Sequence, residues 1–585
     1  MSNKQISELL KKVASAYAIK NEKKFFFQII AYQKAADAIE NSQSQIVNLY
    51  KKGQLESLPG VGPSIKAHLE ELLRTGEVKQ FNWVFEDIPD SVFPLLKVSG
   101  FGPKKAYKLA TYLHLNNTET AIDELEKAAN SNKISQIEGF GEKSQQEILR
   151  AIEEFKKGNT KEKKMNLSIA TEVSEKIISY LKESKDVLRV ETLGSLRRSK
   201  ETIKDIDIAV STNNPKKVIK HFISYPYSEK TIEEGVISAS IAAFGGKQID
   251  LMTQSPDGFG SLMQHFTGSK NHNIKLREYA LKKGLSLSEY GIKKNKKLIK
   301  FKTEENFYNA LKMQWIPPEM REDGGEIELA LKNKLPKLIE LKDLKGDLHI
   351  HSNYSIEPSH DLGKDTMERI LETAIKMKYE YIAFSEHNPS VSKHTNKSVY
   401  EILSRRSLKI EQLYSNIKSV RLIKLLEIDI LANGELAIDN RSIDLLDGFI
   451  ASIHSSFNAS QEDMTKRILN ALSHPKAKIL GHPTGRIINQ REGYKLNWDK
   501  IFDFCKKNNK ALEINSWPSR LDINDKLIRE AIQNKVKLVI NSDSHAAWQM
   551  TMLKYGVANA RRGWAKKENI LNTLPYDKFI EWLKK

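Results

Sequence analysis

The part of the sequence that limits the fold most strongly begins at Lys345, where short apolar runs alternate with amphipathic stretches of helical spacing. Seven runs read as strands: GDLHIHS, YIAFSEH, IKLLEIDIL, GFIASIHS, KILGHP, ALEIN and KLVINSDSH. Strands that alternate with helices predict a parallel β/α construction. In a closed barrel of this kind the carboxyl ends of the strands gather on one face. Side chains at those ends are therefore expected to meet.

Six of these runs end in residues that can bind a metal ion. The residues are His349, His351, His387, Glu427, His454, His482, Asp543 and His545. The two members of the HIH pair, and of the DSH pair, are two positions apart and point to the same side of a strand. A lone histidine is more often a satisfied core or surface residue, but the shared position at strand ends favours a metal centre. Imidazoles mixed with carboxylates suit Zn²⁺, Mn²⁺ or Fe²⁺ better than Mg²⁺ alone, and clustered cations can polarise a phosphodiester.

A second candidate site lies in GSLRRSKETIKDIDIAV, residues 194–210. Read as a strand, DIDIAV places Asp205 and Asp207 on one face and the apolar residues on the other. Their mutual repulsion is best relieved by a divalent cation with oxygen ligands, most naturally Mg²⁺. Asp250, in the strand-like run KQIDLMT, is a third candidate ligand. The alternative is a solvated strand edge, which is what an isolated DxD usually marks.

Three related turns punctuate the first 155 residues, which otherwise read as short amphipathic helices. The turns are LPGVGP, VSGFGP and IEGFGE, with glycines at Gly60, Gly62, Gly100, Gly102, Gly139 and Gly141. Glycine lets the backbone turn tightly and approach a ligand, and a helix start just after the turn offers free N–H groups to a phosphate. This pattern resembles the helix-hairpin-helix motif, which holds DNA by its backbone without reading sequence. A single such turn would be an ordinary helix corner, but three in series favour DNA binding.

Composition limits the class of protein. A chain of 585 residues suits several domains at roughly 100–200 residues each. The formal charge of +19 fits a polyanionic partner or, alternatively, a lysine-rich solvated surface. A single cysteine, Cys505, excludes an internal disulfide and fits a reducing cytoplasm. Because no apolar run approaches the ~20 residues of a membrane span, we expect a cytoplasmic protein with no membrane partner.

The stretch that carries the paired aspartates also carries groups suited to a polyphosphate: the Gly194-Ser195 turn and the Arg198 guanidinium. Taken whole, it resembles the nucleotidyltransferase palm of family X DNA polymerases, the group that contains DNA polymerase beta. The resemblance implies that the three aspartates hold two Mg²⁺ ions, which activate the primer 3′-hydroxyl and stabilise the leaving pyrophosphate. It also implies that Ser195 and Arg198 bind the incoming triphosphate.

The segment HFTGSKNHNIKLREYA continues this resemblance. Phe266 and Gly268 match positions under the deoxyribose, Asn273 matches a contact to the incoming nucleotide, and Arg277 matches a contact to the template strand. The vertebrate enzymes have tyrosine where this chain has His265, so sugar selectivity does not carry over.

The N-terminal segment IIAYQKAADAIE, with Tyr32, resembles the small domain of DNA polymerase beta that grips the 5′ side of a gap. That domain carries a lysine nucleophile for removal of a 5′-deoxyribose phosphate through a Schiff base. The matching position here is His68, and Lys66 stands two residues earlier. An imidazole cannot replace the amine in that chemistry, so the resemblance extends to gap binding and not to the lyase.

The C-terminal half resembles the PHP (polymerase and histidinol phosphatase) domain, and the order of the two halves is that of bacterial family X polymerases, the PolX family. The resemblance implies a 3′-5′ exonuclease, in some members with abasic-site endonuclease activity, that uses up to three Mn²⁺ or Zn²⁺ ions. The first motif of that family continues HSxxSDG, whereas this chain reads HSNYSIEP. Ile356 thus stands where an aspartate ligand is usual. Either Glu357 takes its place after a small loop shift, or one metal position is weakened. Glu386 stands where aspartate usually precedes the histidine.

The expected fold is multidomain, α+β and α/β, with helical helix-hairpin-helix domains, a nucleotidyltransferase palm and thumb, and a C-terminal seven-stranded (β/α) PHP barrel. The predicted regions are an N-terminal helical DNA-binding domain (1–85), a fingers-type hairpin domain (86–155), the palm (156–255), the thumb (256–325), a linker (326–343) and the PHP region (344–585).

The expected function is a monomeric polymerase that fills short gaps in gapped or nicked double-stranded DNA with dNTPs, with a nuclease that trims 3′ ends. Three alternatives stay open. The first is a DNA-end binding protein with a degenerate PHP site, as His68 and Ile356 allow. The second is a nucleotidyltransferase for RNA or a small substrate, and the third is a PHP phosphoesterase with a DNA-binding, nucleotidyltransferase-like region.

Overall fold

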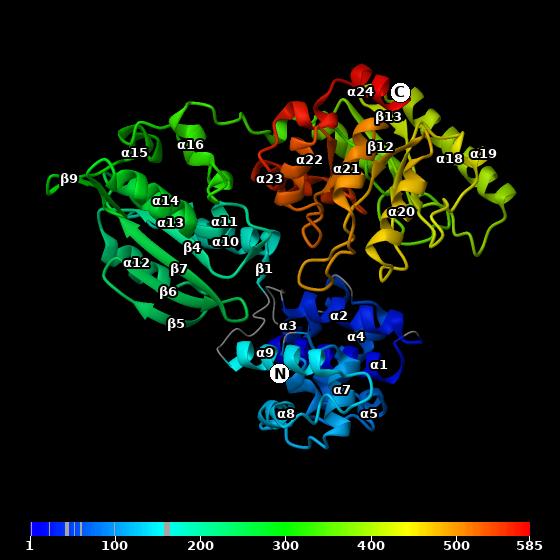
Figure 1. The fold of residues 1–585 in the computed structure, drawn as a ribbon, viewed down its shortest axis with the longest axis horizontal. Coiled ribbons are helices and arrows are strands. Elements are labelled where there is room, and N and C mark those ends of the chain that lie inside the picture. Colours follow the sequence, from blue (N-terminus) through cyan, green and yellow to red (C-terminus); the bar gives the residue numbers. More distant parts are fainter. Residues whose placement is uncertain are drawn as a thin grey trace. The chain divides into compact units, whose positions relative to one another are not determined.

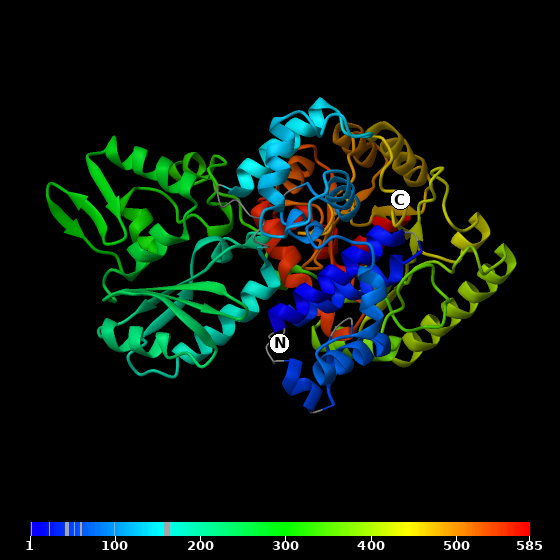
Figure 2. The same cartoon turned by 90° about the horizontal axis from the view of Figure 1, so that it is seen from below.

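The computed structural model describes residues 1–585 except residue 2, residue 23, residues 41–45, residue 52, residues 59–60, residue 99 and residues 157–163. Its first part is all helical (Figure 1). The helices are α1 (Asn3–Asn21), α2 (Phe26–Glu40), α3 (Ile46–Lys51), α4 (Pro63–Thr75), α5 (Lys79–Phe85), α6 (Val92–Leu95), α7 (Pro103–Tyr112), α8 (Ala121–Asn130) and α9 (Glu142–Lys156). They share one apolar core, which includes Leu10, Leu69, Phe81, Leu109 and Ile148. Figure 2 shows these blue and cyan helices gathered together without strands.

The Gly-x-Gly turns have the backbone geometry that helix entry requires. Gly62 and Gly102 are extended N-cap residues of α4 and α7, each followed by proline at the first helical position. Gly100 and Gly139 both have φ +82°, a conformation in which other residues are strained. Nothing lies within 4 Å of where a Cβ would be at Gly62, Gly100, Gly102 or Gly141, so the backbone is open to a ligand there. Gly60 lies outside the described residues.

The palm region contains a five-stranded sheet with strand order β2-β4-β7-β6-β5. Its elements are β1 (Met165–Asn166), α10 (Leu167–Leu181), β2 (Arg189–Thr192), α11 (Gly194–Arg197), β3 (Thr202–Ile203), β4 (Ile206–Ser211), α12 (Pro215–Ile223), β5 (Ser228–Glu234), β6 (Ser238–Ala243) and β7 (Lys247–Gln254). Strands β2 and β4 are antiparallel, with Val190 opposite Val210. Strand β7, which carries Asp250, thus lies next to strand β4 in the sheet. Strand β4 contains Asp207 and begins directly after Asp205.

The thumb region packs helices against a three-stranded antiparallel sheet. Its elements are α13 (Phe259–Thr267), α14 (Lys270–Leu281), β8 (Leu285–Ser288), β9 (Gly291–Lys294), β10 (Lys297–Ile299), α15 (Glu304–Ala310) and α16 (Glu326–Leu331). Ile327, Ala330 and Leu338, from the segment that the sequence suggests as a linker, belong to the apolar core of the thumb. Glu326 is fully buried there, 2.7 Å from Nδ1 of His272.

The C-terminal half alternates parallel strands with helices, as predicted. Its elements are β11 (Gly346–Asp347), α17 (Met367–Lys376), β12 (Tyr381–Phe384), α18 (Asn396–Asn416), β13 (Arg421–Lys424), β14 (Glu427–Asp429), α19 (Asn440–Ile443), β15 (Phe449–Ser452), α20 (Gln461–Leu472), β16 (Ala477–Leu480), α21 (Trp498–Lys507), β17 (Ala511–Asn515), α22 (Asp525–Gln533), β18 (Lys537–Asn541), α23 (Leu553–Arg562) and α24 (Tyr576–Lys584). Strands β11-β12-β13 and β14-β15-β16-β17-β18 pair in parallel, each strand beside the next in the chain.

Backbone hydrogen bonds also join the first of these strand runs to the last. The His351 N–H donates to the Ser544 carbonyl at 2.8 Å, and the Ser544 N–H donates to the His349 carbonyl at 3.2 Å. A parallel bridge between His387 and Glu427 connects the two sheets. The seven predicted runs therefore follow one another in chain order, and their carboxyl ends open on one face.

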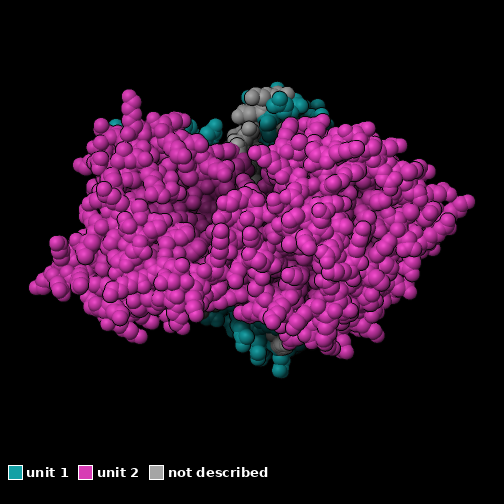
Figure 3. Space-filling model, turned by 90° about the horizontal axis from the view of Figure 1, so that it is seen from above, with its two compact units in different colours: residues 1–164, 220–235, 239–250 teal, residues 165–219, 236–238, 251–585 magenta. Residues whose placement is uncertain are grey.

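The chain divides into two compact units (Figure 3). One comprises residues 1–164, 220–235 and 239–250, and the other comprises residues 165–219, 236–238 and 251–585. Within the described residues, no helix has both the length and the apolar composition that crossing a bilayer would take.

A buried ion network fixes the thumb against the start of the palm. Oε1 of Glu304 lies 2.6 Å from Nη1 of Arg321, and its Oε2 lies 2.6 Å from Nη2 of Arg197. Arg321 is fully buried. Burial favours protonation of the carboxyl, but the Arg321 and Arg197 guanidiniums outweigh it and lower the pKa of Glu304 to about 2.

We predict that Glu304→Gln lowers the free energy of unfolding at neutral pH by ~3–5 kcal/mol, because it leaves the Arg321 guanidinium buried without a counter-charge. Urea denaturation followed by tryptophan fluorescence measures the effect. The depressed pKa makes the carboxylate stabilising above its ordinary value of 4.5, and this advantage is lost as the pH falls towards 2. Glu305→Gln, at the exposed neighbouring position, serves as the control. Equal stability of the two variants would contradict the role of Glu304 as the counter-charge of Arg321.

Candidate active sites

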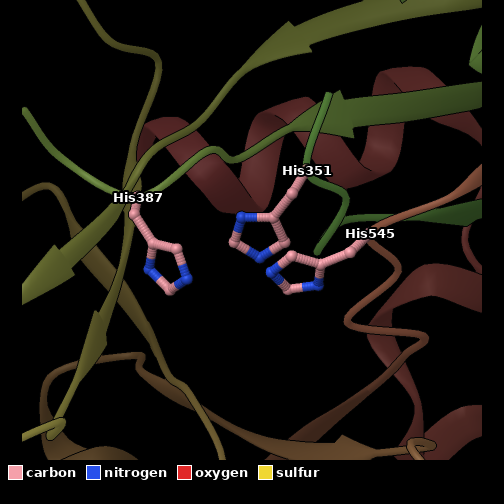
Figure 4. A group of neighbouring side chains, drawn as sticks. All are labelled: His351, His387 and His545. Atoms are coloured by element: carbon pink, nitrogen blue, oxygen red, sulfur yellow. The ribbon is translucent and has the colours of Figure 1, made fainter. Parts of the chain in front are cut away.

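All eight residues predicted at strand ends of the C-terminal half lie together in one buried cluster. Figure 4 shows the rings of His351, His387 and His545, which come from three separate strand runs and face one another. The ring centroids of His351 and His545 are 4.0 Å apart, and those of His351 and His387 are 4.5 Å apart. Their role as metal ligands is a prediction that this arrangement fits.

Glu427 lies at the centre of the cluster. Its Oε2 is 3.1 Å from Nε2 of His349 and 2.9 Å from Nδ1 of His387. Its Oε1 is 2.9 Å from Nε2 of His482 and 3.4 Å from Nε2 of His454. One carboxylate thus touches side chains that are distributed around the ring of strands.

Several buried atoms of the cluster have no hydrogen-bond partner of acceptable geometry, although they lie close to one another. They are His349 Nε2, His351 Nδ1 and Nε2, His387 Nδ1, Glu427 Oε2, His482 Nδ1 and His545 Nε2. Orphaned polar atoms are costly in a protein interior unless something compensates them. Divalent cations with nitrogen and oxygen ligands fit this donor set, and combinations such as His349, His351 and Asp543 offer one ligand atom each within 4.8 Å of the others.

The charges of the cluster also suit cations. Burial lowers the pKa of His351 well below its usual value, helped by His545 and His387, so this ring is neutral and free to donate a lone pair. Burial opposes protonation of His349 as well, but the carboxylates of Glu513 and Glu427 raise its pKa well above the usual value. A cation that binds His349 therefore displaces a proton from it.

Glu513 is a supporting residue that the strand-end argument missed, because ALEIN ends in asparagine. Its carboxylate lies 2.7 Å from Nδ1 of His349 and accepts the His482 N–H at 2.7 Å. It also accepts from the amides of Asn515 and Asn541. It thereby fixes the ring of His349 with Nε2 towards the cluster. The signal in the sequence was a glutamate inside an otherwise apolar strand.

The departures in the first motif have structural consequences. Ile356 is fully buried in the apolar core of the C-terminal half. The suggestion that Glu357 replaces the aspartate finds no support, because its side chain is 60% exposed and lies 3.4 Å from His394. Glu386 is buried and pairs with Arg406, at 2.7 Å from its Nε. It supports the strand ends from beneath.

In the palm, Asp205 and Asp207 are half-buried, while Ile206 and Ile208 between and beside them are fully buried. The predicted alternation of faces is therefore present. Gly194, with φ +57°, lies directly against the Asp207 carboxylate, so any side chain there would collide with it. Asp250 is half-buried on β7 and accepts hydrogen bonds from Ser240 Oγ at 2.5 Å and Gln248 Nε2 at 3.0 Å.

Of the residues predicted to bind the nucleotide, Gly268 lies beside the Arg198 side chain. Its guanidinium donates to the Thr267 carbonyl at 2.5 Å and would lie 3.1 Å from a Cβ at Gly268. Glu322 accepts from Nε of Arg198 at 3.0 Å and from Arg562 of α23 at 3.1 Å. The thumb residue Glu322 thus connects the palm arginine to the C-terminal half.

Asn273 is buried at the start of α14, where Gln264 Nε2 donates to its side-chain oxygen at 2.9 Å. Its amide donates to the His265 carbonyl at 2.7 Å, which ties the helix to the segment of Phe266. Phe266 is half-buried, Ser195 is half-buried at the start of α11, and Arg277 is exposed.

In the N-terminal helices, Tyr32 is buried and its hydroxyl lies 2.7 Å from Nδ1 of His68. The other ring nitrogen of His68 is 2.9 Å from the side-chain oxygen of Gln80. Lys66, the nearest lysine in sequence, pairs with Glu56 at 3.0 Å. His68 is thus a member of a hydrogen-bonded polar group, which fits a structural role.

Comparison with family models defines the class of the chain. The model of the DNA polymerase beta thumb matches residues 262–322, and that of the PHP domain matches residues 347–517. A helix-hairpin-helix domain matches residues 1–78, and a SAM-like helix-hairpin-helix tandem matches residues 92–154. These matches define a family X polymerase core joined to helix-hairpin-helix and PHP domains.

The relatives agree with this class. The chain is 32% identical over 576 residues to the DNA polymerase/3′-5′ exonuclease PolX of Bacillus subtilis, covering 98% of this chain and 97% of the relative. The chain belongs to the PolX family. It is also 29% identical over 247 residues to a probable phosphatase of Clostridium acetobutylicum, covering 41% of this chain and 93% of that protein. DNA polymerase lambda of Arabidopsis thaliana is 22% identical over 354 residues, which cover 54% of this chain and 62% of the relative.

We predict that Glu513→Gln lowers the affinity of the cluster for divalent cations by ~10–100-fold, because Gln holds the His349 ring less firmly and makes it less basic. Titration calorimetry of metal-free protein with Mn²⁺ or Zn²⁺ measures the change. Glu462→Gln, in the exposed first turn of α20, is the matched control and should bind like the wild type. Unchanged affinity in Glu513→Gln would show that the carboxylate only packs against the ring.

Proposed function

We propose that this chain fills short gaps in DNA during repair and trims 3′ ends with its PHP domain. The observation that carries the proposal is the match to a DNA polymerase/3′-5′ exonuclease, which extends through both halves at 32% identity. Both candidate sites support it, since the palm keeps its three aspartates and the C-terminal half keeps its eight clustered residues.

The polymerase site is assigned to Asp205, Asp207 and Asp250. The neighbouring positions of β4 and β7 and the half-buried aspartates support this assignment. Two Mg²⁺ ions held there would lower the pKa of the primer 3′-hydroxyl and neutralise the charge of the leaving pyrophosphate. Arg198 and Ser195 bind the triphosphate, Phe266 and Gly268 line the deoxyribose, and Asn273 contacts the incoming nucleotide.

The nuclease site is assigned to the eight clustered residues around Glu427. Mn²⁺ or Zn²⁺ ions held there would polarise a terminal phosphodiester and supply a hydroxide nucleophile. The neutral rings of residues such as His351 hold the cations, and Glu513 keeps His349 oriented.

The partner is gapped or nicked double-stranded DNA, with dNTPs as substrates. The exposed Gly-x-Gly turns of the N-terminal helices bind phosphates by their backbone N–H groups, and Arg277 contacts the template strand. The net charge of +19 supports a polyanionic partner. We place the protein in the cytoplasm as a monomer, with its one cysteine, Cys505, buried and reduced.

A second candidate activity is the hydrolysis of small phosphate esters by the PHP domain. The 247-residue likeness to a probable phosphatase favours it. This activity would use the same clustered residues but no DNA. Assays with DNA and with a small phosphate ester therefore distinguish the phosphatase from the nuclease.

We predict that the two activities separate by mutation. On a labelled duplex with a one-nucleotide gap, with Mg²⁺ or Mn²⁺, Asp207→Ala abolishes extension and spares resection, and His545→Ala does the reverse. Gel analysis with and without dNTPs reads out both reactions. Asp257→Ala, at an exposed site near the end of β7, and His474→Ala, at the opposite end of β16, are the controls.

Loss of both activities in either variant would contradict two independent sites. Hydrolysis of a small phosphate ester without any release of nucleotides from DNA would instead support the phosphatase.

We predict that DNA binding weakens steeply with salt and is nearly independent of sequence. If basic side chains of the protein neutralise about 6 phosphates, the affinity for DNA falls on the order of 10³-fold between about 50 and 200 mM salt. Fluorescence anisotropy with two gapped duplexes of different sequence measures both effects. A shallow salt dependence, or a strong preference for one sequence, would rule out contacts mainly to phosphates.

A further inference from the structure

The loop after β11, which contains Ile356, also carries a histidine, His360. Ile356 turns into the apolar core, and the chain beyond it runs beside the segment after β12. The Ser359 N–H donates to the Asn388 carbonyl at 2.8 Å, and Pro358 bridges to Pro389. These contacts hold the next residue, His360, beside Asp429 and close to His454.

His360 lies against Asp429 and close to two residues of the cluster, His454 and His387. Its Nε2 lies 3.1 Å from both carboxylate oxygens of Asp429. Its ring centroid is 4.4 Å from that of His454 and 5.1 Å from that of His387. Nδ1 of His454 is 2.7 Å from Asp429, and its Nε2 is 3.4 Å from Glu427. His454 thus stands between this group and the centre of the cluster.

We propose that His360 replaces the missing aspartate ligand and, with Asp429 and His454, holds a divalent cation at the rim of the cluster. The three residues each offer one ligand atom, and these atoms all lie within 4.8 Å of one another. The inference rests on the proposed metal role of the eight clustered residues. Neither His360 nor Asp429 is among them.

The exchange of ligand type changes which cation is preferred. An imidazole in place of a carboxylate makes the position less anionic and softer, which favours Zn²⁺ over Mn²⁺. The His360 side chain is 34% exposed, whereas His349 is fully buried. The cation at the rim therefore exchanges with solvent more readily than those held inside.

The alternative is that Asp429 only hydrogen-bonds the two imidazoles. His360→Ala and His360→Asn together separate these possibilities. Asparagine can still donate a hydrogen bond to Asp429 but is a weak ligand for Zn²⁺. If His360 binds a cation, both variants lose it, whereas if His360 only donates a hydrogen bond to Asp429, His360→Asn retains it.

The test is to load metal-free full-length protein with Zn²⁺, remove the excess by dialysis and count ions per chain by elemental mass spectrometry. We expect both His360 variants to retain one ion fewer than the wild type. His394→Ala, in the same part of the domain and paired with Glu357, should retain the full number. His360→Asp should restore the ion and shift its preference towards Mn²⁺ in a competition with Zn²⁺.

A full complement of ions in His360→Ala would overturn the proposal. A wild-type protein that retains no ions, or a His351→Ala variant that loses none, would instead overturn the proposed metal centre itself. Circular dichroism of each variant checks that the fold is kept, and the exposed position of His360 makes substitution there compatible with folding.

Discussion

The C-terminal half is organised around the Glu427 carboxylate, which is buried and surrounded by imidazoles. Such a carboxylate is unfavourable in an apolar interior unless positive charge or a cation compensates it. Burial tends to raise the pKa of Glu427, but His349, His387 and His454 outweigh it and lower the pKa well below the ordinary value. The ring of strands brings these groups together, so the cluster and the order of the strands depend on each other.

Buried polar residues also join the strand runs of the C-terminal half by side-chain contacts. Asp347 is fully buried. Its carboxylate accepts hydrogen bonds from the Ser542 backbone N–H at 3.1 Å and from the Ser542 hydroxyl at 2.5 Å. Burial raises its pKa to about 6. Together with Glu513 and the Glu386–Arg406 pair, it ties the first strand run to others by side chains as well as by backbone. The predicted ligands are thus anchored by surrounding hydrogen bonds, which suits catalysis that depends on geometry.

Much of this could be predicted from the sequence, because strands and their ends leave a local signal. The alternation in DIDIAV and the histidines after apolar runs required only periodicity and the rule that parallel strands end on one face. Glu513 and His360 could not be found in that way. Glu513 acts from inside a strand, and His360 reaches the cluster only because a loop pairs with a segment about thirty residues further on. The identity of the palm residues needed a resemblance, since a pair of aspartates on a strand has no unique meaning.

The contact of Glu322 with both Arg198 and Arg562 joins segments that lie far apart in the sequence. One carboxylate is shared between an arginine at the proposed triphosphate pocket and an arginine on helix α23, with Lys200 at 3.4 Å as a third cation. Ion pairs of Glu322 with Arg198 and Arg562 thus link the proposed triphosphate pocket to helix α23.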